Sequence, residues 1–232
     1  MMKQNKEIPP VIAIDGPSGS GKGTVATRLS VELGWHLLDS GALYRLVSLA
    51  VLKMGLDPSD GERLAVLSKE FDIRFEPRET DSTVISLNGE NVSEQIRAEE
   101  VGNMASRIAA IEPLRKALRA RQRAFRQAPG LVADGRDMGT IIFPDAILKI
   151  FLTASVEKRA GRRYKQLKAK GESVNLPRLF REIEARDNRD RNRPIAPLVP
   201  AEDAVILDST GLSIEQVLAE IRSLMSQRNI TH

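Results

Sequence analysis

Short apolar runs recur along the chain, and stretches with helical spacing lie between them. The first run covers residues 11–14, and the others are 36–38, 131–133, 147–152 and 205–207. Continuous apolar runs of this length are typical of strands that are buried on both faces of a parallel sheet. Strands that alternate with helices predict an α/β fold, with one five-stranded parallel sheet covered by helices on both faces.

Helical spacing is clearest after the first strand, where Val25, Leu29 and Leu33 recur every four residues. This pattern predicts a helix over 24–33, and Gly34 suits its C-terminal cap because glycine tolerates positive φ. Apolar spacing, caps and Pro113 in a first turn predict the other helical stretches: 42–54, 62–70, 98–127, most of 157–193, and a last helix that begins with a capping box at 213–216.

Residues 57–97 have a different character. Residues 71–75 alternate between apolar and polar, 83–87 are strand-like, and Asn88-Gly89 is a typical hairpin turn. We expect a small antiparallel insert here, forming a lobe near the substrate side.

A glycine-rich loop over residues 16–24 joins the first strand to the first helix. In that context, backbone amides can surround phosphate oxygens and the helix dipole favours the same anion. Lys22 can reach the terminal phosphates as a point charge. Gly23 stands where the common motif has Ser or Thr, so Thr24 is the nearest hydroxyl for magnesium. The alternative is a glycine-rich turn without a ligand.

Polar residues follow the next two strands as well, at Asp39-Ser40 and at 134–137. Ligands of parallel sheets bind at the carboxyl ends of the strands, so these residues and the loop should share one site.

Composition narrows the class of protein. The 232 residues contain no cysteine, which excludes disulfides and thiol chemistry, and no run of 18 apolar residues. The first residues lack the apolar core of a secretory signal, and together these features favour a cytoplasmic protein. Residues 157–193 carry 13 basic and 6 acidic side chains, which suits a polyphosphate ligand. Aromatic residues are only 4%, too few for a surface that stacks single-stranded nucleic acid.

Several stretches together resemble the bacterial cytidylate (CMP) kinases, a family of P-loop nucleoside monophosphate kinases. The Gly-Lys-Gly-Thr ending of the loop is similar to that of monophosphate kinases in general. The more specific likeness covers nearly the whole chain and lies in 14–24, 38–41, 133–140, 186–193, 197–198 and 207–210, with the insert at 57–97.

The chemistry of such a reaction fits the residues. The phosphate of a nucleoside monophosphate is already a nucleophile, so no general base is needed. Cations must instead hold two charged phosphates in line and stabilise the charge at transfer. A kinase that acts on an alcohol would want a carboxylate beside the hydroxyl.

Asp137 suits recognition of cytosine, because a carboxylate accepts from the N4 amino group, whereas uracil presents a carbonyl there. The alternative is a helix N-cap after the third strand. The resemblance implies that Ser40, Arg115 and Arg193 complete the base pocket. The alternatives are a solvated helix residue for Arg115 and a turn former for Ser40. The resemblance also implies that Ser106, Arg186 and Asp190 contact the sugar. The acceptor phosphate would be bound by Arg45 and Arg136.

Arg186, Asp190 and Arg193 are spaced to share one helix face. The alternative is a solvated helix with ion pairs such as Asp187 with Arg191, worth only about 0.2–0.5 kcal/mol each.

The resemblance also implies that arginines of the cationic segment clamp ATP phosphates or cover adenine when a lid closes. Closure would exclude water. Arg159, Arg162 and Arg163 are the candidates, Lys158 competes with them, and Gly171 suits the lid tip. The expected donor site comprises Gly16, Pro17, Ser18, Gly19, Ser20, Gly21, Lys22, Gly23, Thr24 and Arg159, and the expected catalytic residues are Lys22, Arg136, Arg162 and Arg163.

We therefore expect one kinase domain, with a core over 10–56, 98–156 and 194–232, the insert at 57–97 and the lid at 157–193. It would transfer phosphate from ATP to CMP and dCMP, with Mg²⁺ bound mainly by phosphates and water, Thr24 as a ligand and Asp134 in its outer shell. It would be a cytoplasmic monomer that binds neither membrane nor nucleic acid. The alternatives are a kinase for another monophosphate or a small alcohol, and a nucleotide-dependent regulator or RNA-binding protein.

Overall fold

The computed structural model describes residues 8–78, 83–169, 171 and 173–230. It is an α/β structure whose central sheet has five parallel strands in the order β2-β6-β1-β7-β8. These strands are β1 Val11–Asp15, β2 His36–Asp39, β6 Leu131–Gly135, β7 Leu148–Thr153 and β8 Val205–Asp208. All five lie where the apolar runs predict them, so the predicted fold class is confirmed.

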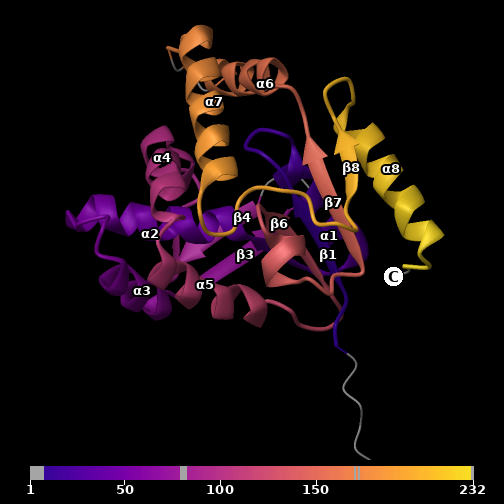
Figure 1. Ribbon diagram of the computed structural model, residues 1–232, viewed down its shortest axis with the longest axis horizontal. Coiled ribbons are helices and arrows are strands. Elements are labelled where there is room, and N and C mark those ends of the chain that lie inside the picture. Colours follow the sequence, from indigo (N-terminus) through magenta and orange to yellow (C-terminus); the bar gives the residue numbers. More distant parts are fainter. Residues whose placement is uncertain (1–7, 79–82, 170, 172, 231–232) are drawn as a thin grey trace, which may run out of the picture.

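Helices cover both faces of this sheet (Figure 1). Ile12 and Ile14 of β1 pack with apolar residues of α1 (Lys22–Leu33) and α8 (Ile214–Gln227). The alternate residues Val11 and Ala13 pack on the other face, with α2 (Ser40–Met54) and α5 (Glu112–Ala124). The continuous apolar run of β1 is therefore explained by burial on both sides.

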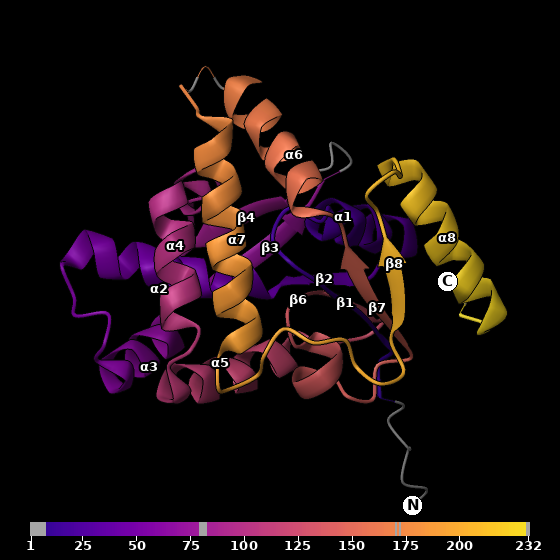
Figure 2. The same cartoon turned by 45° about the horizontal axis from the view of Figure 1, so that its top comes forward.

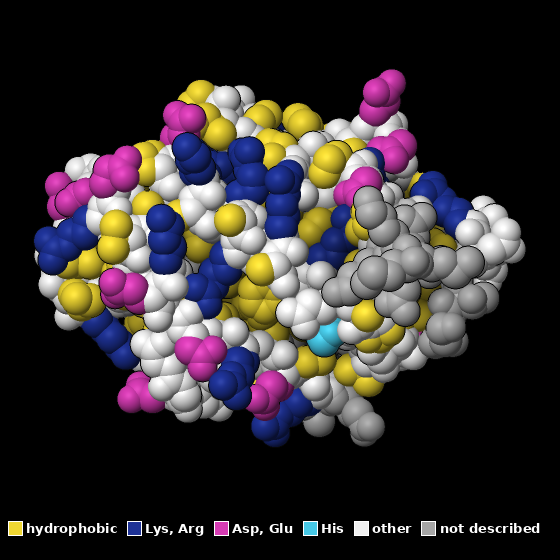
Figure 3. Space-filling model, turned by 90° about the horizontal axis from the view of Figure 1, so that it is seen from below, with side chains coloured by type: hydrophobic (Ala, Val, Ile, Leu, Met, Phe, Trp, Pro, Cys, Tyr) yellow, Lys and Arg dark blue, Asp and Glu magenta, His cyan; other side chains and the backbone are white. Residues whose placement is uncertain are grey.

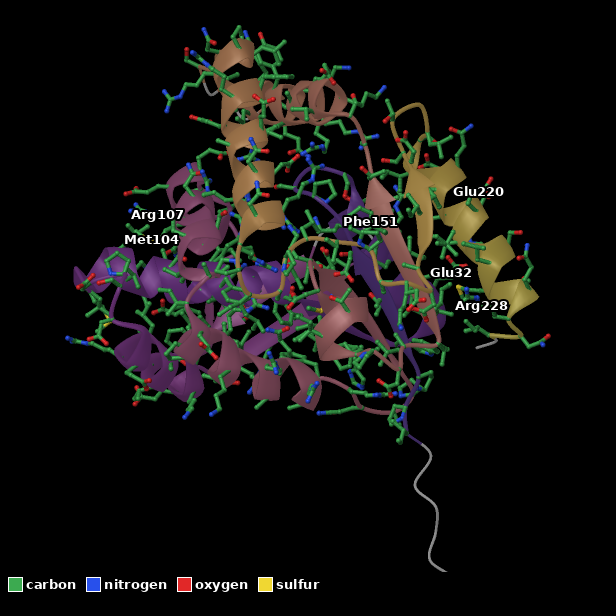
Figure 4. All side chains as sticks on the ribbon, viewed as in Figure 1. Glu32, Met104, Arg107, Phe151, Glu220 and Arg228 are labelled. Atoms are coloured by element: carbon green, nitrogen blue, oxygen red, sulfur yellow. The ribbon has the colours of Figure 1, made fainter. Side chains whose placement is uncertain are left out.

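The helix ends follow the predicted capping chemistry. Gly34 ends α1 with a φ of 65°, and Gly55 ends α2 with a φ of 62°. Ser213 and Gln216 form the predicted capping box at the start of α8. Arg222 of α8 also forms a 2.7 Å ion pair with Glu32 of α1, and Figure 4 labels Glu32.

The insert contains α3 (Gly61–Glu70) and an antiparallel sheet of β3 (Ile73–Pro77), β4 (Thr83–Leu87) and β5 (Glu90–Asn91). Asn88 and Gly89 both have positive φ, as the hairpin turn predicted. Strand β3 begins two residues later than expected. Apolar side chains of the insert, such as Ile73 and Ile85, join the same core cluster as α2 and α5.

The region expected over 98–127 forms a short helical turn η1 (Gln95–Arg97), then α4 (Glu99–Ile108) and α5. The cationic segment forms two packed helices, α6 (Val156–Ala169) and α7 (Leu176–Asn192). Figures 1 and 2 show this pair beyond the end of β7, over the loop between β1 and α1. The strands therefore direct their carboxyl ends towards the cationic helices.

Within the described residues, no helix is both long enough and apolar enough to span a membrane.

Candidate active site

The loop between β1 and α1 has the backbone of a tight phosphate-binding turn. Gly16 has a φ of 153°, and a Cβ atom at this position would lie 2.0 Å from the carbonyl oxygen of Leu152. Gly19 and Gly21 also have positive φ, and Gly21 is the N-cap of α1. Glycine is therefore required for the strand and the loop to approach so closely, and the free amides of α1 point towards the loop.

Lys22 is buried at the first turn of α1. Its Nζ donates to the carbonyl oxygen of Pro17 at 3.0 Å and lies 4.0 Å from Oδ1 of Asp134. Burial, reinforced by Arg136, lowers the pKa of Lys22 to about 8. Burial raises the pKa of Asp134 to about 7, with Lys22 acting against that shift. The lysine is thus a desolvated cation at the base of the loop.

A cavity of about 550 Å³ lies between the loop and the helices α4, α6 and α7. Of the predicted donor residues, Ser18, Gly19, Gly21, Lys22, Gly23, Thr24 and Arg159 line it, together with the arginines Arg45, Arg162, Arg163 and Arg186. Gly16, Pro17 and Ser20 shape the loop without lining the cavity. Lys158, the competing candidate, is exposed and does not line the cavity either.

Arg159 connects three segments of the chain through hydrogen bonds. Its guanidinium is fully buried, and it donates to the carbonyl oxygens of Ala154 at 2.9 Å and of Ser18 at 3.0 Å. It also binds both carboxylate oxygens of Asp187 on α7. The alternative interpretation, a solvated helix in which Asp187 pairs with Arg191, is therefore wrong for this residue. Asp187 is 2% exposed, because the face of α7 that carries it packs against α6.

The other two arginines predicted to belong to a lid also hold protein groups. Arg162 donates to the carbonyl oxygens of Ser20 at 3.1 Å and of Ser209 at 2.7 Å. Arg163 pairs with Glu99 of α4 at 2.6 Å. Both side chains nevertheless line the cavity.

A second cluster lies beyond the carboxyl end of β6. Asp137 is 5% exposed, binds Arg115, and lies 4.0 Å from Nη2 of Arg193. It occupies the N-cap position of the π-helical turn η2 (Met138–Ile142), but its side chain makes no capping hydrogen bond. The alternative interpretation of Asp137 as an N-cap is therefore wrong. Ser40 lies against the end of β6: a Cβ atom added to Gly135 would be 2.6 Å from its Oγ.

Arg136 and Asp190 connect this cluster to α7. Nε of Arg136 donates to Oδ2 of Asp190 at 3.0 Å, and Ser106 of α4 donates to Oδ1 at 3.2 Å. Burial opposes ionisation of Asp190, but Arg136 and Arg186 outweigh it and lower its pKa. Arg186 and Asp190 lie on α7 as predicted, whereas Arg193 is the C-cap residue that follows it.

Between the two clusters lie desolvated cations that are electrostatically coupled to one another. Burial, reinforced by Arg136 and Arg45, lowers the pKa of Arg186 to about 9, and its Nε has no hydrogen-bond partner. Burial likewise lowers the pKa of Arg45, whose Nη1 donates to the carbonyl oxygen of Ile96 at 2.6 Å. Desolvated guanidinium groups this close together are costly without a counter-anion, and a phosphate group is the anion they fit.

The oxygen donors beside Lys22 suit a hard cation. Thr24 lines the cavity, and Oδ1 of the buried Asp134 has no hydrogen-bond partner. The described residues contain no group of three or more His, Cys, Asp or Glu side chains that could hold a metal ion. A metal here would therefore depend mainly on oxygens of the bound phosphates and of water.

Four residues of the site were assigned no role from the sequence. Asp187 and Glu99 hold the lid arginines, Ser209 donates to the carbonyl oxygen of Ser20 at 3.0 Å, and the Tyr44 ring lies 5.9 Å from the Arg115 guanidinium. Ser209 and Asp187 lie within stretches that carried the resemblance, which was their only signal. The others depend on pairing between distant segments.

Away from this site, the charges are mixed. Figure 3 shows the face opposite α6 and α7, where Lys and Arg side chains are interspersed with acidic and apolar ones. The desolvated cations are instead enclosed by the loop, α4, α6 and α7. A glycine loop at a helix N-terminus, a cavity beside it and several desolvated cations together define a P-loop phosphotransferase.

The family follows from comparison with known proteins. The sequence model of the family described as "Cytidylate kinase" matches residues 12–227. The chain is 59% identical over 222 residues to the cytidylate kinase of Stutzerimonas stutzeri, covering 95% of this chain and 97% of that protein. It is also 59% identical to the cytidylate kinase of a Marinomonas species, covering 91% of this chain and 93% of the other. The chain belongs to the cytidylate kinase family.

A solved structure, TT1252 from Thermus thermophilus, aligns over 95% of this chain and 98% of its own, at 19% identity and a TM-score of 0.46.

Proposed function

We propose that the protein transfers the terminal phosphoryl group of ATP to CMP, giving ADP and CDP, and that it also accepts dCMP. One observation supports this most strongly: desolvated cations lie between a phosphate-binding loop and a buried carboxylate that can accept from cytosine. Membership of the cytidylate kinase family supports the same reaction. Arg45 and Arg186 line the cavity and are electrostatically coupled to Arg136, and an acceptor phosphate between them would complete the charge balance.

The donor would bind along the loop. Its phosphates would accept from the amides of residues 19–24, and Lys22 would exchange the carbonyl oxygen of Pro17 for phosphate oxygens. Thr24 and Asp134 are the residues we assign to Mg²⁺, which when bound would neutralise charge on the phosphates. The two neighbouring cations have separate roles: Lys22 would bind the donor phosphates, and Arg136 would bind the acceptor phosphate.

The acceptor would bind in the cluster beyond β6. Asp137 would accept from the cytosine N4 amino group, with Arg115 and Arg193 holding the carboxylate and Ser40 beside it. Asp190 and Ser106, already joined by a 3.2 Å hydrogen bond, would accept from and donate to the ribose hydroxyls. A 2′-hydroxyl would add at most one such contact, which is why we expect dCMP to be a substrate too.

Transfer needs no general base, since an oxygen of the acceptor phosphate attacks directly. Lys22 and Arg136 would hold the two phosphates in line and stabilise the charge on the transferred group. Arg162 and Arg163 would join them when α6 releases the carbonyl oxygen of Ser209 and the carboxylate of Glu99. Their approach would also exclude water, so that ATP is not hydrolysed.

We further propose that the protein works in the cytoplasm and that it is a monomer.

The test is ADP formation from ATP with CMP, dCMP, UMP, AMP, GMP and shikimate as separate acceptors, with the product identified by chromatography. CMP and dCMP should give rapid ADP formation and the matching diphosphates. A preference for any other acceptor would contradict the proposed substrate. Tight, steeply salt-dependent RNA binding with little acceptor-dependent turnover would favour the RNA-binding alternative.

A further inference from the structure

The turn after β6 is capped by a residue from another strand. Asp137 stands at the N-cap position of η2, where a side chain usually accepts from the first free amides. Its carboxylate instead faces Arg115 and Arg193. The amides of Met138 and Gly139 therefore need another acceptor, because buried N–H groups are rarely left unpaired.

Asp15, the last residue of β1, is that acceptor. Its Oδ1 accepts from the Met138 amide at 2.8 Å, and its Oδ2 accepts from the Gly139 amide at 2.8 Å. Strands β1 and β6 are neighbours in parallel register, with Asp15 opposite Gly135, so the carboxylate spans a single strand spacing. One side chain thus fixes both leading amides of the turn that carries Asp137.

This arrangement carries a cost to the fold. Asp15 is 4% exposed, and burial raises its pKa to about 6 although the Gly139 and Met138 hydrogen bonds act against that shift. Burying a carboxylate costs desolvation free energy, which the two hydrogen bonds from neutral amides offset only in part. A role that packing alone cannot fill would explain why a carboxylate lies here.

We infer that Asp15 is a positioning residue for the acceptor base, which caps η2 in place of Asp137 and so leaves the Asp137 carboxylate for the cytosine amino group. The inference rests on the proposed function, in which Asp137 binds cytosine. Asp15 also immediately precedes Gly16, so the strand that delivers the donor loop also fixes the residue that reads the acceptor.

The test is Asp15→Asn, which preserves the shape of the side chain but can accept from only one of the two amides. Its NH₂ group would face the other N–H, and the turn would have to shift. Calorimetric titration should show CMP binding weakened about tenfold, as expected for one unsatisfied buried donor, and a lower ratio of CMP to UMP affinity. Binding of a non-hydrolysable ATP analogue should change by less than about twofold, since no donor contact is removed.

Ile12→Val is the matched control. Ile12 lies on the same strand, is fully buried and packs on the face of the sheet that carries α1 and α8. This variant should lower the melting temperature without changing CMP affinity or the CMP to UMP ratio. An Asp15→Asn protein with unchanged CMP affinity, or with equal losses for CMP and the ATP analogue, would overturn the inference.

If Asp15→Asn does not fold, hydrogen exchange in the wild-type protein decides. The Met138 and Gly139 amides should exchange slowly, and CMP should slow them further than it slows the Ile12 amide. Rapid exchange, or no response to CMP, would overturn the inference. Failure of the wild-type protein to bind CMP would instead refute the proposed function, so the two failures are distinguishable.

Discussion

Replacement of Asp137 by asparagine would test how the acceptor base is chosen. The carboxylate binds Arg115 and lies 4.0 Å from Arg193, in a site where it is 5% exposed. Asparagine keeps one acceptor oxygen but replaces the other with an NH₂ donor. That donor would face a guanidinium group or the cytosine N4 amino group, and both of these are donors themselves.

The size of the effect follows from the burial. A hydrogen bond to a charged group contributes about 1.5–3 kcal/mol, which corresponds to a roughly 10- to 150-fold loss of kcat/KM for CMP. UMP should lose less, because its O4 carbonyl can accept from the new NH₂ group. The ratio of kcat/KM for CMP to that for UMP should therefore fall by at least about tenfold.

The assay is the initial rate of ADP formation with CMP or UMP as the varied substrate and ATP saturating. Asp145→Asn is the matched control, since it also removes a carboxylate from an arginine pair, the 2.7 Å contact with Arg126, but at the amino ends of the strands. The control should leave both acceptors unaffected. An unchanged CMP to UMP ratio in Asp137→Asn would refute the assignment of Asp137 as the base reader.

Three further predictions concern the donor side. The pKa of Lys22 is lowered to about 8, so the free enzyme loses this positive charge as the pH rises through 8. We therefore expect kcat/KM for ATP to fall over that range in the wild type. Lys22→Arg should show no such fall, because arginine stays charged. Arg159→Ala leaves Asp187 buried without its partner and should lower the free energy of unfolding in urea by about 3–5 kcal/mol. As a control, Glu182→Ala removes the exposed Arg178–Glu182 pair and should cost under about 1 kcal/mol. Glu99→Gln removes the partner that holds Arg163 away from the donor, so KM for ATP should fall roughly two- to fivefold at low salt; a higher KM would show that the pair organises the site instead.

The sequence was most informative where a local rule decides the structure. The glycine loop, the two-sided burial of β1 and the glycine caps at Gly34 and Gly55 depend on residues that are neighbours in the chain, and all were found where expected. The start of β3 was displaced because Phe71 is the C-cap of α3, so the alternating pattern begins before the strand does.

Pairing between distant segments could not be predicted in this way. Asp187 is four residues from Arg191, which favours a helix-surface pair, but α6 brings Arg159 to it across 28 residues. The cap on η2 comes from Asp15, across more than 120 residues. Such partners depend on the strand order β2-β6-β1-β7-β8, which no apolar pattern specifies.

The most direct test of the central claim is a competition. Equal, sub-saturating concentrations of CMP and UMP are mixed with ATP and the wild-type protein, and CDP and UDP are quantified while little of either acceptor is consumed. Their ratio gives the ratio of kcat/KM values, and a carboxylate that accepts from N4 predicts that CDP exceeds UDP by at least about tenfold. Equal amounts of the two diphosphates, an excess of UDP, or ADP formation without either product would contradict the account.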